Sequence, residues 1–186
     1  KNTASGNVAI GCAALECNTS GANNVAVGLD ALTANTTGQK NTAIGSESAI
    51  KTTTGQSNAS VGHISMHCNT SGCYNTAMGS CALRFNTTAN NNTATGNLAL
   101  YTNVTGASNT AVGASALKES TTANNTAVGM ETLACTTSGF GTAVGYGAMK
   151  ANTTSSGSTA MGYQAMCANT TGSNNTAFGL EALKTN

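Results

Sequence analysis

Hydrophobic positions recur along the chain with a fixed period. In most repeats an apolar residue follows Thr-Ala and precedes a glycine, and a second apolar residue stands four positions after that glycine. The spacing between successive anchor glycines is 17 residues in eight of ten intervals and 16 in the other two. A near-constant period over the whole chain indicates a tandem-repeat architecture. The anchor glycines are Gly11, Gly28, Gly45, Gly62, Gly79, Gly96, Gly113, Gly129, Gly145, Gly162 and Gly179.

The idealised unit reads N-T-A-V-G-x-x-A-L-x-x-N-T-T-G-x-N. This period is too short for paired helices, and the density of Gly, Asn, Thr and Ser disfavours helix. Seventeen extended residues at about 3.3 Å each trace a loop of roughly 56 Å, a reasonable circuit for one coil. We therefore predict an all-β fold, a β-solenoid (β-roll or β-helix) of about eleven coils. Successive coils are expected to stack about 4.8 Å apart.

The residue before each anchor glycine is almost always apolar, so we expect it to point into the core. These residues are Ile10, Val27, Ile44, Val61, Met78, Thr95, Val112, Val128, Val144, Met161 and Phe178. Strand neighbours face opposite sides, so the preceding residue should face the other way. That residue is never larger than Ala or Ser, which suggests that another backbone lies close to it, from the same coil or a neighbouring chain. It is Ala9, Ala26, Ala43, Ser60, Ala77, Ala94, Ala111, Ala127, Ala143, Ala160 or Ala177.

The second apolar stripe is also expected to be internal. It consists of Leu15, Leu32, Met66, Leu83, Leu100, Leu117, Leu133, Met149, Met166 and Leu183. The coil with Ala49 and Ile50 is expected to slip this register by one residue. Two large apolar groups and two alanines per coil contribute about 3–6 kcal/mol when buried, which is little against the entropy of ordering a whole coil. The chain is therefore predicted to associate with itself, as a homotrimer that pools its stripes or as an end-to-end filament.

Two ranks of asparagine accompany the apolar stripes, and Asn side chains can bond to equivalent residues in stacked coils. One rank is Asn18, Asn35, Asn69, Asn86, Asn103, Asn152, Asn169 and Asn186; the other is Asn7, Asn24, Asn41, Asn58, Asn75, Asn92, Asn109, Asn125 and Asn175. We expect both to form ladders along the rod.

Composition narrows the classes of function. Charged residues make up 7% of the chain and aromatic residues 4%, and the net charge is +1. This balance indicates no nucleic-acid partner, and no apolar stretch is long enough for membrane insertion. We expect residues 1–186 to be one repetitive segment without caps, a processed or partial chain belonging to a longer fibre.

Catalytic and metal-binding patterns are weak. The six acids (Glu16, Asp30, Glu47, Glu119, Glu131 and Glu181) are scattered among the repeats, whereas sugar-cleaving sites need paired carboxylates. His63, His67, Cys68 and Cys73 are zinc-ligand types, but their spacing matches no standard zinc site. We interpret them as exposed polar residues, and we predict no enzyme activity, no metal and no cofactor.

Seven cysteines are present, an odd number. Cys12 with Cys17, and Cys68 with Cys73, could form disulfides across a turn. At least one thiol is then free or bonded between chains. The alternative is that the cysteines simply fill space as small apolar residues.

Eleven N-x-S/T sequons are candidates for N-glycosylation. They begin at Asn18, Asn35, Asn58, Asn69, Asn86, Asn91, Asn103, Asn124, Asn152, Asn169 and Asn174. Seven share one repeat position, so glycans there would line one edge of the rod. The alternative is that Asn-Thr-Thr is favourable turn chemistry.

The runs Asn41–Gly45 and Asn175–Gly179 resemble repeats of phage and viral tail-fibre proteins. Asn7–Gly11 is similar to the strand of head repeats in trimeric autotransporter adhesins, although those repeats are shorter and lack the second turn. The resemblance covers the whole chain. It implies a homotrimer displayed extracellularly, on a cell or virion surface, for attachment.

The sequence therefore predicts a structural fibre or filament segment. An ice-binding solenoid is the first alternative, motivated by a threonine rank, although one rank is fewer than ice lattices usually match. The threonines are Thr76, Thr93, Thr110, Thr126, Thr142, Thr159 and Thr176. Binding of cell-surface glycans is the second alternative, with few aromatic residues to support it.

Overall fold

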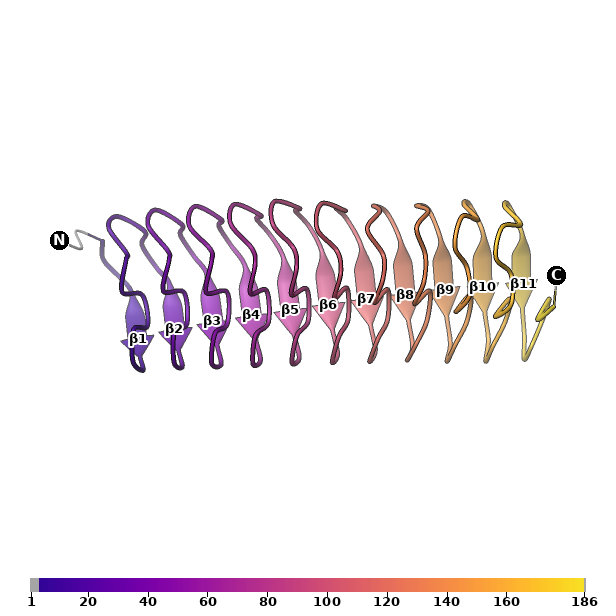
Figure 1. Ribbon diagram of the computed structural model, residues 1–186, viewed down its shortest axis with the longest axis horizontal. Helices are drawn as coiled ribbons and strands as arrows, with labels where there is room; N and C mark the ends of the chain where they lie inside the picture. The colour runs from indigo at the N-terminus through magenta and orange to yellow at the C-terminus, as the bar shows by residue number, and fades with distance from the viewer. Residues whose placement is uncertain (1–3, 186) are drawn as a thin grey trace.

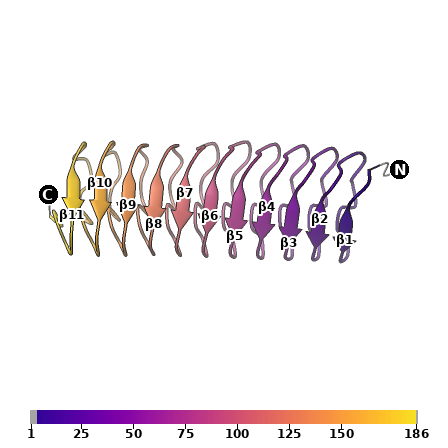
Figure 2. The same cartoon turned by 180° about the vertical axis from the view of Figure 1, so that it is seen from behind.

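Short parallel strands, one in each repeat, organise the chain in the computed structural model, which describes residues 4–185. The eleven strands of this part of the chain are β1 (Val8–Ile10), β2 (Val25–Val27), β3 (Thr42–Ile44), β4 (Ala59–Val61), β5 (Thr76–Met78), β6 (Thr93–Thr95), β7 (Thr110–Val112), β8 (Thr126–Val128), β9 (Thr142–Val144), β10 (Thr159–Met161) and β11 (Thr176–Phe178). They form one sheet in sequence order. The coils stack into a rod with the termini at opposite ends (Figures 1 and 2). The predicted all-β solenoid is confirmed.

In every pair of neighbouring strands, each residue pairs with the residue at the same repeat position in the next coil. Thr93, Ala94 and Thr95 of β6, for example, pair with the three residues of β7. Hydrogen bonds also join successive coils outside the strands, as from the Leu100 amide to the Ala116 carbonyl at 3.0 Å. The whole circuit of each coil, and not the strand alone, is therefore held to the next.

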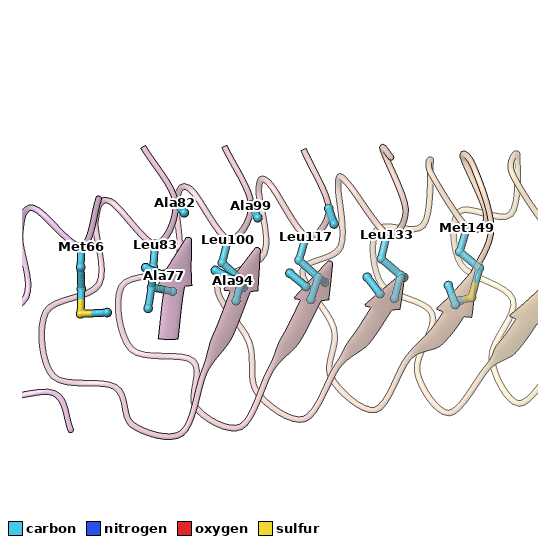
Figure 3. Packing of buried hydrophobic residues seen from close by; sticks show 14 of the residues in the cluster. Met66, Ala77, Ala82, Leu83, Ala94, Ala99, Leu100, Leu117, Leu133 and Met149 are labelled. Atoms are coloured by element: carbon cyan, nitrogen blue, oxygen red, sulfur yellow. The ribbon is translucent and has the colours of Figure 1, made fainter. Parts of the chain in front are cut away.

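The strand faces are the reverse of those predicted. The small residue at the centre of each strand is buried from β2 to β11, whereas the large residue before the anchor glycine lies at the surface. Ile10 is 60% exposed and Met78 is 48% exposed, while Ala77 and Ala94 are completely buried. The expectation that the large residue points into the core was wrong. The close neighbour of each strand alanine lies in its own coil: the leucine or methionine that enters from the turn after the glycine (Figure 3). This side chain fills the narrow interior and leaves room only for a methyl group from the strand.

The second apolar stripe is internal from Leu15 to Met166, as predicted, but the expectation was wrong for Leu183, which is 45% exposed. Leu32, Met66, Leu83, Leu100, Leu117, Leu133, Met149 and Met166 are all completely buried. Most coils thus bury one large apolar side chain, where the sequence predicted two. These residues also adopt positive φ angles, such as 50° at Leu100, a rare conformation for bulky residues. The coil-to-coil hydrogen bonds described above hold the backbone in this conformation.

The predicted register slip at Ala49 and Ile50 does not occur. Ala49 occupies the leucine position, is buried, and donates its amide to the Ser65 carbonyl at 2.9 Å. Three buried hydroxyls lie in the same region: Ser48 and Ser60 are 2.9 Å apart, and Ser60 and Ser65 are 2.7 Å apart. The backbone hydrogen bonds between coils set the register. The space that leucine fills in other coils lies next to these serine hydroxyls.

Both asparagine ladders form inside the rod. In one, the Asn92 side chain accepts from the Asn109 amide at 2.9 Å and donates to the Gly106 carbonyl at 2.9 Å. In the other, Asn86 donates to the Asn69 side chain at 2.9 Å. Asn186 lies outside the described residues. Much of the interior is therefore a polar hydrogen-bonded column alongside the single leucine stripe.

The two coils of 16 residues interrupt these ladders. Ser120 and Thr136 replace the asparagine of one ladder, and Gly141 replaces that of the other. The Ser120 hydroxyl is buried without a hydrogen-bond partner. The strands still pair in register across both coils, because the shortened segment is the turn between Ser120 and Asn125 and its equivalent in the next coil.

Candidate interaction surface

The outward side chains of the sheet form a continuous surface that the sequence analysis did not anticipate. We define the outer strand face as the first and third residues of strands β1 to β11. Both point outward because the central alanine points inward. The first residue is most often threonine and the third is most often valine, isoleucine or methionine. The face therefore carries two parallel ranks, each repeated once per coil.

The outer strand face contains no charged residue. Its third-position rank is exposed at several places along the rod, including Ile10, Ile44, Met78, Val112, Val128, Met161 and Phe178. A large exposed apolar patch is unusual on a monomeric protein and typically marks an interaction site. This face is the most prominent candidate site of the molecule.

Aromatic and aliphatic residues flank this face near the C-terminal end. The residue after the anchor glycine is Met130, Tyr146, Tyr163 or Leu180 in the last four coils, and all four are exposed. The rings of Tyr146 and Tyr163 stack with centroids 5.3 Å apart and planes at 16°. The earlier coils carry mostly small or polar residues at this flanking position, Leu29 excepted.

The sequons divide into two groups. Asn18, Asn35, Asn58, Asn69, Asn86, Asn103, Asn152 and Asn169 are buried. Their amides donate inside the rod, as from Asn58 to the Gly72 carbonyl at 2.8 Å. A glycan cannot be attached there without opening the coil, which removes the predicted line of glycans along one edge. Asn91, Asn124 and Asn174 are exposed, so glycosylation of the folded chain stays a prediction for these three.

All seven cysteines are unpaired. The bridges between Cys12 and Cys17 and between Cys68 and Cys73 remain predictions. Cys12 and Cys17 are exposed, and the other five are partly buried. Burial, together with nearby Glu119, raises the pKa of the Cys135 thiol, which makes this cysteine a poor nucleophile at neutral pH.

The acidic residues and histidines form no metal centre and no pocket within residues 4–185. Asp30 and Glu47 nevertheless occupy the same position in adjacent coils, a proximity that a sequence search for clusters overlooks. His63 is exposed. His67 instead contacts both Cys68 and Glu47, so it is not the isolated exposed residue that was expected. Glu47 stands 20 positions before His67, three more than one repeat, and lies near it only because the coils stack.

No protein-family model, curated protein or solved structure matches this chain. In the described part of the chain, no helix is long and apolar enough to cross a membrane.

Proposed function

We propose that this protein is a structural segment of an extracellular fibre, a rigid rod for attachment or display at a cell or virion surface. The observation that carries the proposal is the continuous parallel sheet from β1 to β11, which hydrogen bonds between the turns reinforce in most of the described coils. Such a ladder resists bending, because each coil is tied to its neighbours around its circuit. The small number of charged groups and the absence of a pocket in residues 4–185 fit a mechanical role.

Self-association into a homotrimer is part of this proposal. The outer strand face is uncharged and exposes a large apolar residue in seven of its eleven strands. A second copy has the same coil spacing, so its apolar rank matches this one coil for coil along the rod. Contact between such faces buries the apolar rank and excludes water from it, which stabilises the assembly by the hydrophobic effect.

Lysine substitutions on the outer strand face are expected to dissociate this assembly. We expect the wild-type chain to sediment as a trimer. The double variant Val112→Lys/Val128→Lys should weaken association by at least about a hundredfold, because a desolvated unpaired charge costs several kcal/mol. The measurement is analytical ultracentrifugation over a concentration series, with electron microscopy to display rods with a layer spacing of about 4.8 Å.

The matched control is Val104→Lys/Thr88→Lys, which places the same charges on exposed turns away from this face. Val104 and Val112 are 41% and 37% exposed, so both substitutions should be tolerated by the fold. A monomeric wild-type chain, or equal dissociation in both double variants, would contradict the assembly.

Ice binding is a second candidate, favoured by one specific observation. The inward alanine leaves two outward ranks in place of the single rank inferred from the sequence. Threonine hydroxyl and methyl groups line the first rank from β5 to β11, beside the mainly aliphatic second rank. Repeats at the strand spacing of about 4.7–4.9 Å offer a regular array to ordered water.

Thermal hysteresis separates the two candidates, since both use the outer strand face. An ice-binding protein should lower the freezing point below the melting point at micromolar concentration, and Val112→Lys/Val128→Lys should remove this effect while the turn variant retains it. A trimer without hysteresis supports the fibre and rejects ice binding. A monomeric wild-type chain with thermal hysteresis supports ice binding and rejects the fibre.

A further inference from the structure

The only histidine that contacts a cysteine within residues 4–185 is His67, which also connects two coils. Its Nδ1 atom lies 3.5 Å from Sγ of Cys68, and its Nε2 atom lies 3.4 Å from Oε2 of Glu47 in the preceding coil. A histidine between a thiol and a carboxylate is the arrangement that activates a nucleophile. The cluster lies away from the outer strand face, and the proposed function does not use it.

The two contacts specify the tautomer of His67. The Glu47 carboxylate only accepts, so it favours a proton on Nε2. Nδ1 then carries the lone pair and faces the thiol of Cys68. Glu47 therefore acts as a positioning residue, and His67 as a proton acceptor.

The charge state of His67 suits this role at neutral pH. Burial and the neighbouring cations Lys51 and Arg84 lower the pKa of the ring below its ordinary value, against the opposing effect of Glu47. The imidazole is therefore neutral at pH 7 and free to take a proton. Cys68 itself is partly exposed, so a small reagent can reach its sulfur.

We propose that Cys68 is a reactive thiol that forms a mixed disulfide with low-molecular-weight disulfides. The Cys68 proton passes to Nδ1 of His67 as Sγ attacks one sulfur of the small disulfide. The sulfur–sulfur bond of the small molecule breaks while the bond to Sγ forms. The departing thiolate takes the proton from His67, so Cys68 is oxidised and one half of the small molecule is reduced to a thiol.

The chain contains its own controls for this reaction. Cys17 and Cys135 occupy the same repeat position as Cys68, but Glu16 and Ala134 stand where Cys68 has His67. Cys17 is more exposed than Cys68. If accessibility alone decided the rate, Cys17 would react first. If the histidine decides it, Cys68 reacts first.

The test uses three variants that each retain one of these cysteines, with the other six changed to serine. Each reacts with dithiodipyridine, an uncharged disulfide whose released thiopyridone is followed by absorbance. We expect Cys68 to react at least about tenfold faster than Cys17 at pH 7, as general-base assistance predicts, and Cys135 to react slowest. Equal rates for Cys68 and Cys17 would overturn the proposal.

Substitutions of His67 and Glu47 in the Cys68 variant test the mechanism. Acid slows exchange for any thiol by reducing the thiolate fraction. His67→Gln should slow exchange about tenfold or more and should remove the further fall in rate that occurs as acid protonates His67. The pH at which this fall occurs depends on the charges of Glu47, Lys51 and Arg84 around the His67 ring, which also contacts the Cys68 thiol. Glu47→Ala should slow exchange severalfold, and Glu47→Gln should restore most of the rate because its amide oxygen still accepts from Nε2.

Folding does not confound these variants. Glu, Thr, Ile, Arg and Tyr occupy the position of His67 in other coils, and circular dichroism checks that the strand signal persists. An unchanged rate in His67→Gln would overturn the mechanism. A product in which two protein chains are joined through Cys68, with no small-molecule adduct, would overturn the assignment of a small disulfide as the reactant.

Discussion

Gly96→Ala is expected to lower the free energy of unfolding by about 4 kcal/mol or more, among the largest effects of a single substitution. Gly96 has a φ of +130°, and a Cβ atom there would lie 2.6 Å from the carbonyl carbon and oxygen of Gly113 in the next coil. Those atoms belong to the backbone, so the coils must separate locally. The measurement is urea unfolding followed by circular dichroism, with hydrogen exchange of the amides in the two coils that Gly96 joins.

Gly179 provides the control, because its backbone conformation is similar while its surroundings differ. Its φ is +124°, and a Cβ atom added there would meet nothing within 4 Å. In the 186-residue chain, Gly179→Ala should therefore cost only the backbone strain, about 1–3 kcal/mol. If the two variants were equally destabilised, the close approach of the coils would not be the reason for glycine at these positions.

Asn92→Ala is expected to destabilise the rod by about 2–5 kcal/mol. The side chain is completely buried, accepts from the Asn109 amide and donates to the Gly106 carbonyl. Alanine leaves the buried Asn109 amide without a partner, at about 1–3 kcal/mol, and removes one of the two hydrogen bonds that the Gly106 carbonyl accepts, while the Asn103 side chain still donates to it at 2.8 Å. Urea unfolding gives the overall loss, and faster hydrogen exchange at Asn109 would locate it.

Ser158→Asn tests the same ladder in the opposite direction. Ser158 stands where other coils carry asparagine, and its hydroxyl makes longer bonds, 3.2 Å to the Asn175 amide and 3.4 Å to the Gly172 carbonyl. Asparagine should restore the regular pattern and stabilise the chain by about 1 kcal/mol. A loss of stability in Ser158→Asn, or a neutral Asn92→Ala, would show that the ladder contributes little.

The candidate surface could be predicted only in part. Thr93 and Thr95 stand one repeat before Thr110 and Val112. The sequence alone therefore predicted that equivalent residues form regular ranks along the rod. Which ranks face outward did not follow, because alternation along a strand assigns neighbours to opposite sides without choosing the inner side. Side-chain size suggested Val112 for the interior, and the prediction was wrong because Leu117 already fills the space across the coil.

The Cys68 cluster illustrates a different limit. The pairing of His67 with Cys68 is local and visible in the sequence, whereas Glu47 lies 20 positions before His67 and reaches it only through the stacking of coils. The 17-residue period predicts that neighbouring coils approach each other. It does not predict which rotamers bring an imidazole nitrogen between a thiol and a carboxylate.

The sequence by itself determined the period, the all-β solenoid, the inward leucine stripe and the two asparagine ladders. Each of these depends on a residue type repeated at one position, and stacking brings identical residues together whatever the detailed shape of the coil. Only the tertiary structure decided the inner face of the strand, the left-handed backbone at residues such as Leu100, and the burial of most sequons. These depend on the width of the coil, which is set by how Leu100 and Ala94 share one narrow interior.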